Sequence, residues 1–206
     1  MDLERCFEAS VPPPAAFLKW LVSNPSKLRW KGKALDDGSA TSAKRRALSG
    51  ETGPAAQQQA MQEALGALET FGAAGSGRKW WAFEGFTSVD CLLESDNAVL
   101  LIEGKRNDVV SEATDWYAGR NQVIRNLEVA EIRAAGRPFG VLVISESGED
   151  PISPATFTTG LPHLPEGERT RLREHYLGCV SWHAVCRAVG IEYERLPSTV
   201  VEALAG

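Results

Sequence analysis

Residues 88–107 read SVDCLLESDNAVLLIEGKRN, and this stretch decides the fold. Two runs rich in Val, Leu and Ile are separated by the dipeptide Asp-Asn at positions 96–97. Asx residues tolerate left-handed backbone angles, so the dipeptide predicts a tight turn between two antiparallel strands. Counted back along both strands from this turn, the register pairs Asp90 with Glu103.

The predicted hairpin brings charged side chains together on one face. Directly opposed residues on neighbouring strands have Cβ atoms roughly 5 Å apart, so the carboxylates of Asp90 and Glu103 would face each other. Lys105 lies two residues beyond Glu103 and therefore points to the same face. The opposite face is expected to belong to the core, and its residues are Val89, Cys91, Leu93, Leu100 and Ile102.

Two opposed carboxylates in a half-buried sheet repel each other and lose solvation, so each charge needs compensation. A divalent hard cation supplies it, because carboxylate oxygens suit Mg²⁺ or Mn²⁺ and leave coordination positions for water and phosphate. Asp90 and Glu103 are therefore the candidate metal ligands. Lys105 would orient the attacking water and stabilise charge on a phosphate. The alternative is an ordinary hairpin with an exposed Glu-Lys pair.

Asp90, twelve intervening residues and the tripeptide EGK at 103–105 resemble the D…(D/E)xK signature of the PD-(D/E)XK nuclease superfamily. Val89 stands where the name-giving motif has proline, a position at which the family often departs from its pattern. The resemblance covers residues 57–145. It implies a nuclease dependent on Mg²⁺ or Mn²⁺, in which the two acids bind the metal and the lysine assists hydrolysis of a phosphodiester, in DNA rather than RNA.

The resemblance also implies a fold. This fold is α/β, with a restriction-endonuclease-like αβββαβ core and a mixed central sheet flanked by helices. We expect one domain, 1–206, in which an N-terminal helix and a basic flexible loop (1–53) precede the nuclease-like core (54–147) and a C-terminal helical extension (148–206) follows it. The expected elements are helices at 14–22, 54–71, 112–135, 166–177 and 182–189 and strands at 79–86, 88–95, 98–105 and 138–145.

Three further residues are candidates for the catalytic site. Glu84 lies close to the hairpin in sequence and would be a third acid or position the water; a glutamate on an edge strand is the alternative. Gln122 resembles the glutamine that the superfamily often places near the start of the helix after the lysine; a capping or surface role is the alternative. Arg120 falls within the apolar stripe of the predicted helix, where a charge needs a partner: the acidic pair, a substrate phosphate or a salt bridge.

A basic segment precedes the core. Between residues 27 and 46, seven Lys and Arg residues stand against two aspartates, a local net charge of +5. Residues 36–53 are polar and rich in Gly, Ser and Thr, which predicts a mobile loop. Lys44, Arg45 and Arg46 are the candidate nucleic-acid-binding residues, on an arm that would bind a phosphate backbone. A solvated linker is the alternative.

The composition limits the class of protein. The 206 residues are 43% hydrophobic, which indicates a folded domain with a core. The net charge of −5 provides no global attraction for nucleic acid, although phosphate contacts can be local. No apolar run reaches the ~20 residues of a membrane span. The four cysteines lack CxxC spacing, which indicates reduced thiols and a cytoplasmic location.

Two function classes follow from these observations. The first is the metal-dependent DNA nuclease, and a homodimer is a further expectation for its partners. The second is a catalytically inactive module of the same fold that binds nucleic acid or protein. The complete set of acid, acid and lysine favours the first class, because an inactive copy has no need for a cluster of buried charges.

Overall fold

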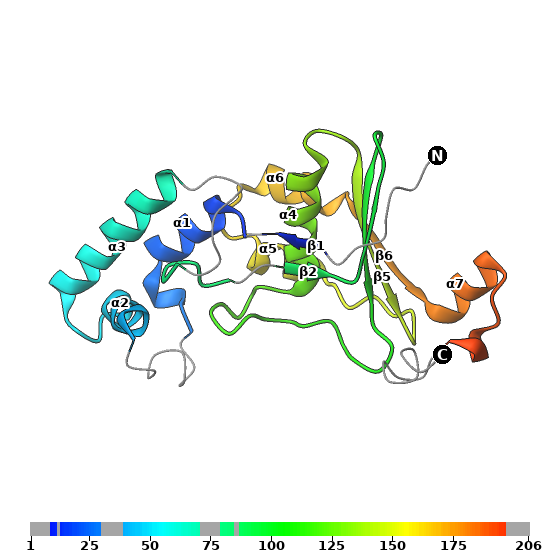
Figure 1. Ribbon diagram of the computed structural model, residues 1–206, viewed down its shortest axis with the longest axis horizontal. Coiled ribbons are helices and arrows are strands. Elements are labelled where there is room, and N and C mark those ends of the chain that lie inside the picture. The colour runs from blue at the N-terminus through cyan, green and yellow to red at the C-terminus, as the bar shows by residue number, and fades with distance from the viewer. Residues whose placement is uncertain (1–8, 12, 30–38, 71–78, 85–86, 197–206) are drawn as a thin grey trace.

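A four-stranded mixed sheet forms the centre of the molecule, in the order β3–β4–β5–β6. The strands are β3 (Cys91–Glu94), β4 (Val99–Gly104), β5 (Phe139–Ser145) and β6 (Tyr176–Ser181). β3 and β4 are antiparallel, whereas β4, β5 and β6 run parallel. The computed structural model describes residues 9–11, 13–29, 39–70, 79–84 and 87–196 (Figure 1).

The hairpin of β3 and β4 has the register that the Asp-Asn dipeptide predicts. Cys91 pairs with Ile102, and the Ser95 N–H donates to the Ala98 carbonyl over 3.0 Å, which closes the turn. Before β3 the chain bends at Asp90. The short strand β2 (Thr87–Val89) precedes this bend and pairs with β1 (Ala9–Val11) in a separate two-stranded sheet.

The prediction that one face of the hairpin belongs to the core is wrong for most of its residues, which are less buried than expected. Cys91, Leu93, Leu100 and Ile102 are only half-buried, although Val89 is buried. The bend at Asp90 breaks the alternation of β2 and β3, so side chains before and after it do not continue one face. The fully buried positions lie on the face that packs against helix α4 (Gln122–Ala134), and they are Leu92, Val99, Leu101 and Glu103.

Helix α4 forms the crossover between the parallel strands β4 and β5. Its predicted buried stripe is confirmed at Val123, Leu127, Ala130 and Ala134. The expected start at residue 112 is wrong, because Asn121 caps the helix by accepting the Val123 N–H over 2.8 Å. Residues 112–121 form an irregular segment. Trp116 and Tyr117 in this segment pack against the apolar residues of the N-terminal part of the chain.

The C-terminal part adds helices and the fourth strand. Helices α5 (Pro154–Gly160) and α6 (Glu166–Arg173) follow β5. The expected helix at 166–177 ends too late, because residues 176–181 are rich in strand-forming side chains and pair with β5. Ser181 caps α7 (Trp182–Val189), accepting the Ala184 N–H over 3.2 Å, and this helix has the expected bounds. A 3₁₀ turn, η3 (Tyr193–Arg195), follows.

An N-terminal group of helices packs at the end of the molecule distant from the sheet (Figure 1). It contains α1 (Ala15–Ser23), the 3₁₀ turn η1 (Pro25–Lys27), α2 (Ala40–Ser49) and α3 (Pro54–Glu69). The expected helix at 14–22 is confirmed to within one residue at each end, and the one expected at 54–71 ends at Glu69. Residue 71 lies outside the described residues. The predicted loop at 36–53 is wrong over residues 40–49, because Ser39 caps α2 and Gly50, with φ of 89°, ends it.

The strand expected at 79–86 is absent from the described part of that segment. Residues 79–84 form turns, and residues 85–86 lie outside the described residues. Trp80, Trp81 and Phe83 are buried among the apolar residues of α1, α2 and α3. These aromatic side chains therefore form part of an N-terminal core instead of a sheet edge.

The overall arrangement is layered. Helix α4, with α5 and α6, covers one face of the sheet, and α7 lies beyond the other face (Figure 1). The expectation of an α/β fold with a mixed sheet flanked by helices is thereby confirmed. Among the described residues, no helix combines the length and the apolar character needed to span a membrane.

Candidate active site at the end of the hairpin

Glu103 is the centre of the candidate site. Its side chain is 0% exposed, near the end of β4. Oε1 accepts hydrogen bonds from Gln122 Nε2 over 2.6 Å and pairs with Lys105 Nζ at 2.5 Å. Oε2 accepts from Asn126 Nδ2 over 2.9 Å. Three side chains from the strand end and from α4 therefore hold this carboxylate in one orientation.

Asp90 lies beside this carboxylate at the bend before β3. Its Oδ2 accepts the Gly104 N–H over 2.9 Å, so Asp90 is anchored to the residue that follows Glu103. Unlike Glu103, Asp90 is exposed. The sequence-predicted pair of acids is thus brought together, one buried and one accessible.

The electrostatics of the pair are set by burial. Desolvation raises the pKa of Glu103 above its ordinary range, and the negative charge of Asp90 raises it further. The hydrogen bonds and the charge of Lys105, together with the amide of Asn126, lower this pKa and only partly offset the increase. Burial and the charge of Asp90 thus outweigh these contacts and favour the neutral form of Glu103.

Lys105 is held at the point where β4 ends. Its N–H donates to the Ile144 carbonyl over 2.7 Å, and its own carbonyl accepts from Trp182 Nε1 over 3.1 Å. The side chain is 14% exposed and lines a cavity of about 320 Å³ that Ser145 and Glu146 also line. Lys105 therefore contacts Glu103 and also lines a hollow whose lining residues do not include Asp90 or Glu103.

The donor atoms here suit a hard divalent cation. Asp90 and Glu103 supply carboxylate oxygens. Asn126 turns its Nδ2 toward Glu103 Oε2, so its Oδ1, a buried acceptor without a hydrogen-bond partner among the described residues, points away from that oxygen. Within the described ranges, no group of three or more His, Cys, Asp or Glu residues assembles as a metal site. The candidate set is therefore the acid pair.

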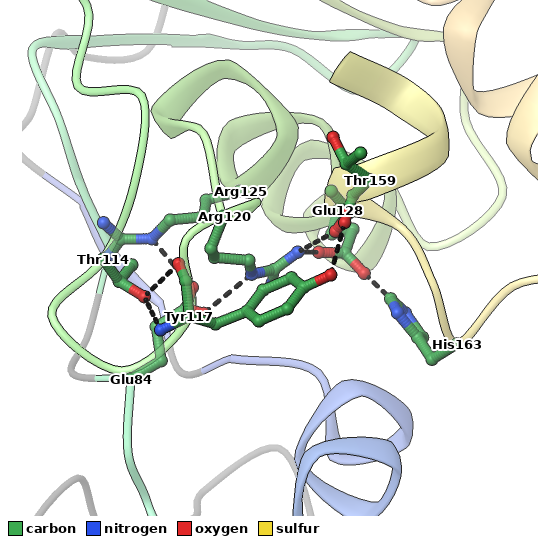
Figure 2. Close-up of polar contacts among 9 residues, drawn as sticks. Glu84, Thr114, Tyr117, Arg120, Arg125, Glu128, Thr159 and His163 are labelled. Carbon is green, nitrogen blue, oxygen red and sulfur yellow. Dashed lines mark hydrogen bonds and ion pairs between the residues drawn. The ribbon is translucent and has the colours of Figure 1, made fainter. Parts of the chain in front are cut away.

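Arg120 and Glu84 lie in a different cluster from the acid pair (Figure 2). Arg120 Nε donates to Glu84 Oε2 over 2.7 Å, and Arg125 Nε donates to Glu84 Oε1 over the same distance. In the described part of the chain, neither Arg120 nor Glu84 forms a hydrogen bond or ion pair with Asp90 or Glu103. Of the alternatives that the sequence left open, the structure therefore shows a salt bridge for Arg120.

The same cluster extends to α4 and to His163. The guanidinium of Arg120 also pairs with Glu128 of α4, and Glu128 Oε1 lies 2.8 Å from His163 Nε2. The Tyr117 hydroxyl donates to the Thr159 carbonyl over 2.7 Å beside them (Figure 2). The cluster is buried, which indicates a role in holding segments together.

The basic residues of α2 are largely engaged with the protein itself. Lys44 pairs with Glu63 and lies 5.7 Å from the Trp80 ring centroid. Arg45 Nε donates to the Trp80 carbonyl over 2.8 Å. Arg46 lies in the last turn of α2. These three residues are thus on a helix packed against α3 and not on the mobile arm that their sequence predicts.

Asn126 is the site residue that the sequence did not reveal. It lies four residues after Gln122, and residues at this spacing share one face of a helix. That spacing would have identified it once Gln122 was placed at the start of α4 instead of ten residues inside a longer helix. No protein-family model, curated protein or solved structure matches this chain.

Proposed function

We propose that this chain is a metal-dependent nuclease that hydrolyses phosphodiester bonds in DNA, on a restriction-endonuclease-like core of the PD-(D/E)XK type. The observation that carries the proposal is the contact set of Glu103. A fully buried carboxylate is held by Lys105, Gln122 and Asn126, with Asp90 beside it. Folding alone gives no reason to bury Glu103 beside a second acid, since its carboxylate loses solvation and the negative charge of exposed Asp90 raises that cost.

Asp90 and Glu103 would hold Mg²⁺ or Mn²⁺, which when bound polarises a phosphate and lowers the pKa of a coordinated water. The order of antiparallel hairpin, crossover helix and parallel strand supports the same class of core. Exposed Asp90 gives the cation access from solvent, and buried Glu103 fixes its position.

Lys105 would act on the phosphate itself. Its ammonium group, at the edge of the hollow, would stabilise the negative charge that develops on the phosphate oxygens and orient the attacking water. Gln122 donates to the same Glu103 Oε1 that pairs with Lys105, and so fixes the position of this oxygen relative to the ammonium group. The chemistry therefore requires both the strand end and the first turn of α4.

The experiment is cleavage of linear, circular, single-stranded and branched DNA in Mg²⁺ or Mn²⁺. We expect Asp90→Asn and Lys105→Met each to lose about 100-fold or more in rate, while the melting temperature stays close to that of the wild type. Asp96→Asn, at the exposed hairpin turn, is the matched control and should cleave normally. Equal cleavage by all three variants would refute the assigned site.

One observation favours the second candidate, an inactive module of the same fold. Both oxygens of Glu103 already accept hydrogen bonds from side chains, so the carboxylate is satisfied without a metal. Calorimetric titration with Mn²⁺ separates the two functions. Heat of binding that Asp90→Asn abolishes supports the nuclease, whereas no binding at millimolar Mn²⁺ supports the inactive module.

A further inference from the structure

A second hollow lies beside the start of α4. Its volume is about 310 Å³, at the low end of the range of small-molecule sites. The irregular segment at 113–116, the buried residues Phe83 and Glu84, and Arg125 from α4 line it. Neither Asp90 nor Glu103 is among the lining residues, so this cavity is distinct from the candidate catalytic site.

The cavity is nevertheless adjacent to that site. Gln122, which contacts Glu103, and Arg125, which lines the cavity, are three residues apart on α4 and so neighbours on its surface. The segment that lines the cavity also belongs to the connection that leaves Lys105 and returns to α4. The cavity therefore lies within one helical turn, along α4, of the residue that holds Glu103.

Arg125 presents unused donors to this cavity. Its Nε is bonded to Glu84, while its Nη1 and Nη2 form no hydrogen bond with the described residues. Figure 2 shows the far end of this guanidinium directed away from the buried cluster. Arg120 binds the other oxygen of Glu84 and so fixes the orientation of this carboxylate, which in turn holds Arg125. The unused donors are thereby fixed in orientation.

The charges around the cavity argue against a phosphate as its ligand. Glu84 is neutralised by Arg120 and Arg125, and Arg120 in turn is balanced by Glu128. The exposed carboxylate of Asp115 lines the same cavity and forms no hydrogen bond or ion pair with the part of the chain that the structure describes. A negative group here would repel an anion, so the lining suits an uncharged ligand that has both donors and acceptors.

One aromatic wall, the half-buried ring of Trp116, completes the lining. The buried ring of Phe83 packs against Trp116 at a centroid distance of 5.7 Å, and the Arg45 guanidinium lies 4.6 Å from the Trp116 ring centroid. A flat ring, fixed guanidinium donors and a carboxylate acceptor are the groups with which proteins bind an unpaired nucleobase, by contact with its face and hydrogen bonding to its edge.

We propose that this cavity binds an unpaired nucleobase adjacent to the phosphate at Glu103 and Lys105. Arg125 donates to acceptors on the edge of the base, Asp115 accepts from its amino or imino groups, and the aromatic wall contacts its face. The proposal rests on the proposed nuclease function for the neighbouring phosphate. It assigns the substrate class as single-stranded nucleic acid or a duplex with an unpaired nucleotide at the cut.

The test is fluorescence anisotropy with labelled oligonucleotides in Ca²⁺, which keeps divalent charge and limits cleavage. The probes are single-stranded DNA, the same strand with abasic sites throughout, and a blunt duplex. We expect the single strand to bind about tenfold or more tightly than the abasic strand or the duplex. Asp115→Asn should change the preference among the four homopolymers, because it exchanges an acceptor for a mixed donor and acceptor.

Arg125→Lys tests the fixed donors, since lysine retains a charge for Glu84 and loses the planar fork. It should remove most of the advantage of the single strand over the abasic strand. Arg133→Lys, at the other end of α4, is the matched control and should retain this advantage. If Arg125→Lys fails to fold, Asp115→Asn still tests the proposal, because a substitution at an exposed residue is expected to leave the fold intact.

The outcomes separate the two proposals. If the protein cleaves DNA but binds normal and abasic strands with equal affinity, the nuclease proposal is supported and the proposal that the cavity binds a nucleobase is refuted. Base-dependent binding without cleavage in Mg²⁺ or Mn²⁺ supports the cavity and overturns the nuclease. Tighter binding of every strand by Asp115→Asn, with no change in base preference, shows that the cavity binds phosphate and overturns the assignment to a base.

Discussion

Arg120 and Glu84 form an ion pair, Nε to Oε2 at 2.7 Å, in which the arginine side chain is 0% exposed and the glutamate 3%. The Arg120 guanidinium also lies 3.9 Å from the ring centroid of Phe17 in α1 and pairs with Glu128 in α4. Phe17 belongs to the N-terminal apolar cluster, whereas α4 belongs to the cluster under the sheet. One buried guanidinium therefore connects the two cores.

We expect Arg120→Met to lower the free energy of unfolding by about 3–5 kcal/mol. It removes the cation and leaves Glu84 and Glu128 buried with only part of their compensation. The measurement is urea denaturation. Arg133→Met is the control, since Arg133 forms a half-exposed pair with Glu94 and should lose less than about 1 kcal/mol. Equal losses in the two variants would contradict a connecting role for Arg120.

Glu103→Gln should raise the melting temperature near pH 8. The pKa of Glu103 is raised above its ordinary value of 4.5, chiefly by burial, so its ionisation opposes folding as the pH rises through the folded-state pKa. Below the ordinary value both folded and unfolded states carry a neutral acid, and the advantage of glutamine should vanish. Calorimetry at several pH values measures this difference; an advantage that persists unchanged in acid would be inconsistent with the raised pKa.

Divalent metal should stabilise the wild type and not Glu103→Gln. A cation that binds only the folded state raises its stability by about 2.7 kcal/mol at 100 times the dissociation constant. Thermal melts with and without Mn²⁺ provide the measurement, with Asp96→Asn as a control that keeps the response. A metal-induced shift of equal size in Glu103→Gln would place the cation elsewhere.

Asn126→Ala should destabilise the fold by about 1–3 kcal/mol, because Glu103 Oε2 loses its donor inside the protein. Gln59→Ala, at an exposed position of α3, controls for the substitution in a helix and should be nearly neutral. Urea denaturation compares the two. A neutral Asn126→Ala would mean that water replaces the amide, and that Glu103 is less enclosed than its contacts indicate.

Gly104→Ala should reduce cleavage more than stability. An added Cβ would meet the Trp182 ring at 3.0 Å and approach Asp90 Oδ2 at 4.0 Å. Because Trp182 Nε1 donates to the Lys105 carbonyl, its displacement would shift the lysine. Kinetics and a melting curve of the same variant separate the two effects. Gly66→Ala, inside α3 where a Cβ meets nothing within 4 Å, is the control: it should leave cleavage unchanged and raise stability by up to about 1 kcal/mol.

Local signals in the sequence determined the hairpin. The Asp-Asn turn and the apolar runs on either side fix which residues pair, because the register of two adjacent strands depends only on the turn that joins them. The acid pair and Lys105 followed from the same stretch, and the apolar run at 138–145 predicted the later strand of the crossover. The helix at 54–69 was equally predictable, since good helix formers follow Pro54 with only Gly66 among them.

Only the tertiary structure decided which face of the hairpin is buried, where α4 begins and which partner Arg120 has. Both hairpin faces are apolar enough to be a core, and the choice depends on the distant helix that packs there. Segment 176–181 became a strand because β5 offered it an unpaired edge. Glu103 is buried because α4 brings Gln122 and Asn126 to it. The spacing of these two residues shows that they share a helix face, but the strand that this face meets depends on the tertiary fold.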